Sequence, residues 1–79
     1  MTLTVLLFAS YADALGRSTL ELDLPPGTTV EELLERVRAM APAVTLPRAL
    51  VAVNQQYAAP GQPVAPGDEI AIIPPVAGG

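Results

Sequence analysis

The chain has 79 residues, 51% of them hydrophobic, and a net charge of −4, which together predict one small domain. Its four basic residues are scattered arginines, so we expect no nucleic acid partner, because binding to a phosphate backbone needs clustered positive charge. The absence of Cys and His excludes disulfides, thiolate nucleophiles and Ser-His-Asp triads, and we expect no metal site.

From Met1 the chain passes directly into an apolar run at residues 3–8, which predicts a first strand. No basic segment precedes a long apolar stretch, and no run of about 20 apolar residues occurs. We therefore expect no signal peptide, no membrane contact and a cytoplasmic location. In this strand the residues divide between two faces, with Leu3, Val5 and Leu7 on one and Thr4, Leu6 and Phe8 on the other.

A short helical turn is predicted over residues 11–16, with Gly16 as its cap. Residues 18–24 then alternate strictly, with leucines on one face and acidic residues on the other, which indicates a half-buried strand. We expect this strand to pair antiparallel with the first. The leucines that face inward are Leu20, Leu22 and Leu24.

The main helix is predicted to begin after Thr29, because Thr29 and Glu32 have the spacing of a capping box. It should end before Pro42. Its apolar stripe consists of Val30, Leu33, Leu34, Val37 and either Met40 or Ala41.

The last third of the chain predicts two more strands, at residues 50–53 and 69–73. Asn54 and Gln55 form a plausible turn into Tyr57, and Pro-Gly pairs mark the loop that follows. One amphipathic helix covers only one face of such a sheet. The order of elements therefore predicts an α+β fold of the β-grasp, ubiquitin-like type, with a mixed sheet of four to five strands. The first and last strands should lie parallel in its centre.

We expect this domain to span residues 1–73 and an extended tail to span residues 74–79, which read Pro-Pro-Val-Ala-Gly-Gly. Glycine lacks a Cβ, so Gly78 and Gly79 can enter a channel that a larger residue would block. Pro74 and Pro75 restrict the backbone and favour an extended exit. These features predict that the Gly79 carboxylate is the reactive group. The alternative is a frayed end without a function.

Several segments resemble the family of molybdopterin synthase small subunits, MoaD: residues 5–9, 15–16, 51–55, 67–69 and 74–79. The ending Pro-Pro-Val-Ala-Gly-Gly is the most specific of them. The resemblance implies a sulfur carrier that binds no cofactor itself. A MoeB-like adenylating enzyme would activate the Gly79 carboxylate with ATP and magnesium, and a sulfurtransferase would convert it to a thiocarboxylate.

The resemblance further implies docking on a MoaE-like large subunit, in a heterotetramer, where the tail donates sulfur to cyclic pyranopterin monophosphate. The active site would lie on that large subunit, so the present chain would be a non-catalytic subunit. The tail residues Val76 and Ala77 would lie against the partner together with both prolines. A docking surface is predicted on the uncovered sheet face, formed by Leu6, Phe8 and Ile73, with Tyr57 beside them.

Four alternatives stay open. The related carrier ThiS of the thiamine pathway has the same fold and the same Gly-Gly ending, and a carrier for cysteine synthesis is also compatible. A ubiquitin-like modifier, joined through Gly79 to a lysine of another protein, would use the same adenylate. In a purely structural domain the Gly-Gly ending would have no role.

Overall fold

The computed structural model describes residues 1–75 and contains five strands and two helices in that part of the chain. Four of the five strands and both helices were predicted from the sequence, and the remaining strand, at Gln56–Tyr57, directly follows the predicted turn at Asn54 and Gln55. The elements in chain order are β1 (Thr2–Leu7), α1 (Ala9–Leu15), β2 (Thr19–Asp23), α2 (Val30–Ala39), β3 (Leu50–Val53), β4 (Gln56–Tyr57) and β5 (Glu69–Ile73).

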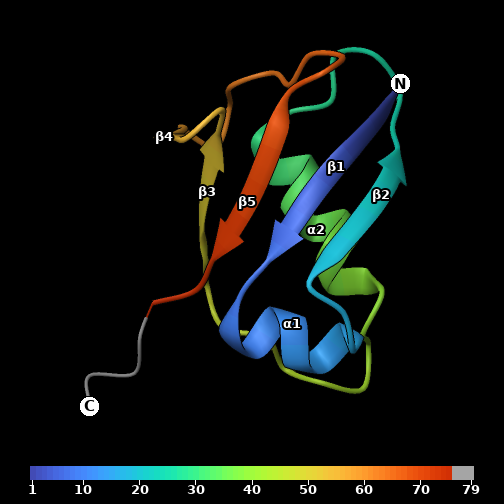
Figure 1. The fold of residues 1–79 in the computed structure, drawn as a ribbon, viewed down its shortest axis with the longest axis vertical. Coiled ribbons are helices and arrows are strands. Elements are labelled where there is room, and N and C mark those ends of the chain that lie inside the picture. The colour runs from blue at the N-terminus through green and yellow to red at the C-terminus, as the bar shows by residue number, and fades with distance from the viewer. Residues whose placement is uncertain (76–79) are drawn as a thin grey trace.

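The strands form one mixed sheet in the order β2-β1-β5-β3-β4. The central pair, β1 and β5, is parallel, and every other neighbouring pair is antiparallel. Helix α2 crosses one face of the sheet, and α1 lies beyond the end at which β1 and β5 finish (Figure 1). The predicted β-grasp fold is therefore confirmed, with the first and last strands adjacent in the centre.

The core lies between α2 and the sheet face that it covers. The alternation predicted for residues 18–24 is confirmed, because all three leucines are buried and Glu21 and Asp23 are exposed. The helix contributes Val30, Leu33 and Val37, while Ala41 is buried just beyond it and Met40 is 47% exposed. Ala41 is thus the last member of the apolar stripe. The strands supply Leu3, Val5, Leu7, Val51, Val53, Ile70 and Ile72.

Local interactions define the beginning of α2 and the end of α1. The Thr29 hydroxyl accepts a hydrogen bond from the Glu32 N–H at 3.3 Å, and the Glu32 carboxylate accepts one from the Thr29 N–H at 3.0 Å. The Thr29 N–H and the Thr29 hydroxyl, which donates to the same carboxylate oxygen at 3.0 Å, lower the pKa of Glu32, because both bonds favour its charged form. Helix α1 ends at Gly16, whose φ of 69° is a left-handed conformation that glycine adopts without steric cost.

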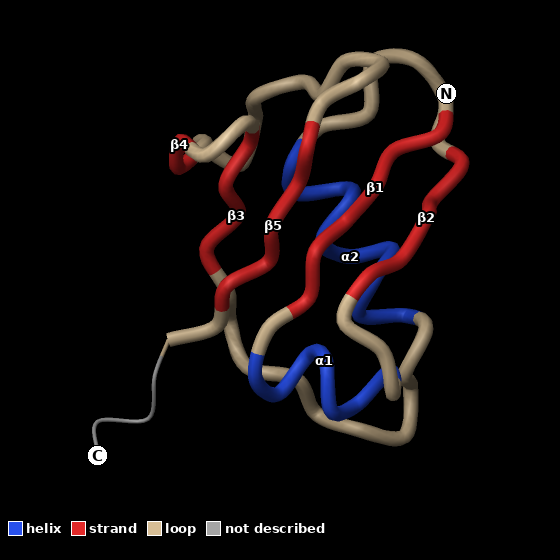
Figure 2. The backbone as a smooth tube through the Cα atoms, viewed as in Figure 1, coloured by secondary structure: helices blue, strands red, loops and turns tan. Residues whose placement is uncertain are grey.

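Helix α1 is tied to the rest of the domain through Tyr11, which is fully buried. Its hydroxyl donates a hydrogen bond to the Pro47 carbonyl oxygen at 2.6 Å. Burial raises the pKa of the Tyr11 phenol, and the nearby Arg38 guanidinium offsets part of that rise. The bond fixes the segment that leads from α2 into β3 (Figure 2).

The turn between β3 and β4 is formed by Asn54 and Gln55, which both have a positive φ, of 51° and 70°. Two such residues in sequence match the twist of a tight hairpin. The Asn54 side chain also donates to the Asp68 carboxylate and accepts from the Glu69 N–H, both at 3.0 Å. It therefore joins the hairpin to the start of β5. Within residues 1–75, no helix has the length and apolar character needed to span a membrane.

Candidate functional site

The candidate site is the sheet face that α2 leaves uncovered, together with the point where the chain leaves β5. Strand register places residues of four strands in one row across this face, because directly paired residues point to the same side. That row consists of Leu6, Ala71, Ala52 and Tyr57. Leu6 and Tyr57 were predicted to lie on this face, and the register confirms both.

A second apolar row lies next to the first and closer to the tail. Ile73 pairs with Leu50 across β5 and β3. Phe8 directly follows β1 with an extended backbone (φ −130°, ψ 154°), so the alternation continues and its ring turns to the same face as Leu6. The open-face patch, as we call it, therefore comprises Leu6, Phe8, Leu50, Ala52, Tyr57, Ala71 and Ile73.

Exposure differs across this patch. Tyr57 is 68% exposed, Leu50 57% and Phe8 47%, while Leu6 and Ile73 are partly buried. Among residues 1–75, three of the five large hydrophobic side chains that are exposed thus belong to one surface. Single exposed apolar residues are ordinary, but a contiguous apolar patch of this kind marks a binding surface. It ends at the polar row of Thr4 and Glu69.

Leu50 was not among the predicted docking residues, although the alternation of residues 50–53 indicates that it faces the same side as the others. In the segment 50–53 the buried face holds Val51 and Val53, so the alternation turns Leu50 and Ala52 to the open face. Ala52 is small and buried between its neighbours, whereas Leu50 is large and near the end of the strand. Their exposure therefore depends on neighbouring strands, which one segment of sequence does not specify.

The two prolines at the end of β5 have different surroundings. Pro74 is buried and Pro75 is exposed. Both prolines were predicted to contact a partner. Of the two, only Pro75 presents its side chain to solvent. The predicted site residues Val76, Ala77, Gly78 and Gly79 lie outside the described residues, so their roles stay predictions.

The described part of the chain offers a binding surface. In residues 1–75 no group of three or more Asp, Glu, His or Cys side chains is placed to hold a metal ion. What the arrangement provides is an apolar surface whose second row contains Ile73, the last residue of β5, paired with Leu50. Figure 1 shows that the chain leaves the sheet at this end of β5. A partner seated on this surface would therefore stand next to the emerging C-terminal segment.

Comparisons with known proteins show which family the chain resembles. Residues 5–79 match the model of the ThiS family. The molybdopterin synthase sulfur carrier subunit of Dictyostelium discoideum is 39% identical over 95% of this chain and 93% of its own. The protein of the same name from Chlamydomonas reinhardtii is 36% identical over the full length of both chains.

A solved structure gives a second line of similarity. SAMP1 from Haloferax volcanii, a small archaeal modifier protein, covers all of this chain and is itself covered completely. The two share 30% sequence identity with a TM-score of 0.82. The chain is thus similar both to carrier subunits and to a protein modifier.

Proposed function

The chain belongs to the ThiS family, and we propose that it is the sulfur-carrier subunit of a molybdopterin synthase, acting in molybdenum cofactor biosynthesis. The similarity to two proteins of that name, extending over nearly the whole length of each, is the observation that supports this most strongly. Because both relatives are named as subunits of a synthase, their similarity also supports a second, larger subunit as the partner of this chain. In our proposal that partner is a MoaE-like large subunit that carries the active site.

The proposed chemistry takes place at the Gly79 carboxylate. A carboxylate is a poor electrophile and is ionised at neutral pH, so it must first receive a leaving group. A MoeB-like enzyme would supply one with ATP and magnesium, forming an acyl adenylate and releasing pyrophosphate. A sulfurtransferase would then replace AMP with sulfur, and the thiocarboxylate would donate it to cyclic pyranopterin monophosphate. The proposed place of action is the cytoplasm.

The open-face patch has a defined part in this proposal. The activating enzyme and the large subunit both need the same tail, so they would use the same surface in turn. Phe8, Leu50 and Tyr57 offer the apolar contact area, and Pro75 is exposed where the chain leaves β5. From Pro74, six extended residues reach at most roughly 20 Å. This length allows the carboxylate to enter a buried site while the domain stays docked outside.

The decisive experiment is the intact mass of the protein purified from cells that make molybdopterin. We expect a species heavier by one oxygen-to-sulfur exchange, which fragmentation places on Gly79. Deleting Gly79, or adding one residue after it, should abolish both this species and sulfur transfer. Gly61→Ala is the matched control, because Gly61 lies in an exposed loop with open space around it. Full sulfur transfer by either tail variant would refute the proposal.

A protein modifier is the second candidate, because SAMP1 is similar over the whole chain. In that case Gly79 would form an isopeptide bond with a lysine of another protein. The same cells distinguish the candidates. Because Arg48 is the last trypsin site of the chain, a modifier yields tryptic peptides in which a lysine of another protein carries residues 49–79. Transfer to a thiamine precursor in place of the pterin would instead identify a carrier of the ThiS pathway.

A further inference from the structure

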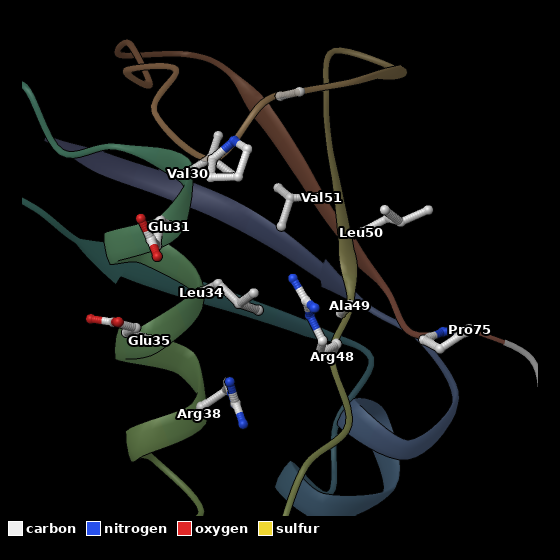
Figure 3. Close-up of a pocket in the computed structure, with 12 residues that line it drawn as sticks. Val30, Glu31, Leu34, Glu35, Arg38, Arg48, Ala49, Leu50, Val51 and Pro75 are labelled. Carbon is white, nitrogen blue, oxygen red and sulfur yellow. The ribbon is translucent and has the colours of Figure 1, made fainter.

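A second surface lies on the other side of β3. A groove of about 620 Å³ runs between α2 and the outer edge of this strand (Figure 3). Val30 and Leu34 line its helix wall, and Ala49 and Val51 line its strand wall. Its volume falls within the range of roughly 300–1,000 Å³ that is usual for ligand sites. The proposed function makes no use of this groove.

The strand wall of the groove is an open sheet edge. Strand β4 pairs with β3 only at Ala52 and Val53, and the last bond on this side joins the Ala58 N–H to the Val51 carbonyl at 2.9 Å. Because backbone groups alternate along a strand, those of Ala49 point to the same side as those of Val51. In residues 1–75 Ala49 makes no backbone hydrogen bond. Such an edge is a template for a further strand.

The side chains next to this edge are apolar and could pack against the apolar residues of an added strand. A strand added along Ala49 would direct every second side chain toward α2, where Leu34 and Val51 form the groove floor (Figure 3). The intervening side chains would lie against Leu50, which points away from α2 and is 57% exposed. Both sides of an incoming β-strand therefore meet apolar surface.

Two arginines of the groove indicate the charge of the partner that it would bind. Arg38 lies at the end of the groove opposite Val30, and the Arg48 side chain extends from the strand side toward the level of Leu34 (Figure 3). Neither is part of a salt bridge in the described part of the chain, although Arg38 donates a hydrogen bond to the Leu46 carbonyl at 3.2 Å. Glu31 and Glu35 of α2 also line the groove, but their carboxylates extend away from β3 (Figure 3). An acidic group would thus be attracted to the two arginines.

We propose that the groove binds an extended segment of a partner protein, which adds to the sheet as a strand beside Ala49. The segment has alternating aliphatic residues followed by acidic residues, which lie against Arg38 and Arg48. Main-chain hydrogen bonds to Ala49 would supply affinity, and the apolar floor and the arginines would supply specificity. Pro75 of the tail and Leu50 of the open-face patch also line this groove, but the site does not depend on the proposed function.

The probe is a blocked peptide of sequence VTVTVDD, titrated into the ¹⁵N-labelled full chain. An antiparallel strand places its acidic C-terminal end beside Arg48, at the start of β3. We expect amide shifts at Ala49, Leu50, Val51 and along α2. Arg48→Glu should weaken binding about three- to tenfold, since an exposed ion pair is replaced by repulsion. Ala49→Pro should weaken it about tenfold or more, because it removes one donor and obstructs the edge.

Arg36→Glu is the matched control, because it makes the same charge change on α2 but does not line the groove. It should leave binding unchanged, as should deletion of Gly79. Four results would overturn the proposal: no shifts at residues 49–51, shifts centred on Phe8 and Tyr57, equal binding of the peptide VTVTVRR, or self-association of the chain through β3 in place of peptide binding. Preserved spectral dispersion shows that each variant is folded.

Discussion

Replacing Tyr11 with Phe tests whether α1 is held in place by one buried hydroxyl group. The aromatic ring stays, so the change removes only the hydrogen bond to the Pro47 carbonyl oxygen, 2.6 Å long. Loss of such a bond costs about 0.5–1.5 kcal/mol of folding free energy. Pro47 itself is exposed, so water can reach its carbonyl, and we expect a cost of about 1 kcal/mol. For a domain of this size that corresponds to a melting temperature lower by about 4–8 °C.

Urea unfolding at neutral pH measures this cost, and Tyr57→Phe is the matched control. Tyr57 undergoes the same chemical change but is 68% exposed, so its loss should alter stability by less than about 0.5 kcal/mol. Equal stability of the two variants would refute the role assigned to the Tyr11 hydroxyl.

The same pair of variants predicts a difference at alkaline pH. Burial raises the pKa of Tyr11 above its usual value of 10.0, so the folded chain holds this proton more tightly than the unfolded chain. The corresponding stability is fully present below about pH 10 and is lost as the pH rises through the folded pKa. Unfolding measured between pH 8 and about 11 should show this loss in the wild type and in Tyr57→Phe. An undiminished alkaline loss in Tyr11→Phe would contradict the assignment.

Three further substitutions test the cap, the hairpin and the open-face patch. Thr29→Ala removes the side-chain bonds of the capping box and should destabilise the domain by about 1 kcal/mol in urea unfolding. The pKa of Glu32 should rise only part of the way, because the backbone N–H of residue 29 still donates to its carboxylate, and an unchanged Glu32 titration by NMR would argue against the side-chain bond. Asn54→Ala removes two side-chain hydrogen bonds and a residue that tolerates a positive φ, so the free energy of unfolding measured in urea should fall by about 2–3 kcal/mol. A loss below about 0.5 kcal/mol would show that the hairpin forms without these bonds. Phe8→Asp should weaken binding to both the activating enzyme and the large subunit by tenfold or more in calorimetric titration, roughly 1.4 kcal/mol; Val44→Asp, a similar change at a residue 49% exposed outside the patch, should not.

Local interactions account for the elements that the sequence predicted well. The alternation of residues 18–24, the Thr29–Glu32 box and the glycine after residue 15 each depend on neighbours close in the chain. For the same reason the turn at Asn54 was predictable. The order of these elements then left little choice of fold, because one amphipathic helix can cover only one sheet face.

The binding surfaces depend on contacts between distant segments. The open-face patch brings residue 8 next to residues 50 and 73, and only the register of β1, β5 and β3 produces that proximity. Leu6, Phe8 and Ile73 were predicted from alternation alone, whereas Leu50 required knowledge of which strand lies beside β5. The bond between Tyr11 and Pro47 spans 36 residues, and no local pattern indicates it.

The sequence by itself determined the β-grasp order of elements and the Gly-Gly ending, because secondary-structure periodicity and chemical type are local properties. Only the tertiary structure decided that Pro74 is buried while Pro75 is exposed, and that an open sheet edge faces Leu34 across a groove. The physical reason is that burial and edge exposure depend on which strands and helices become neighbours. Side-chain packing over the whole domain selects those neighbours.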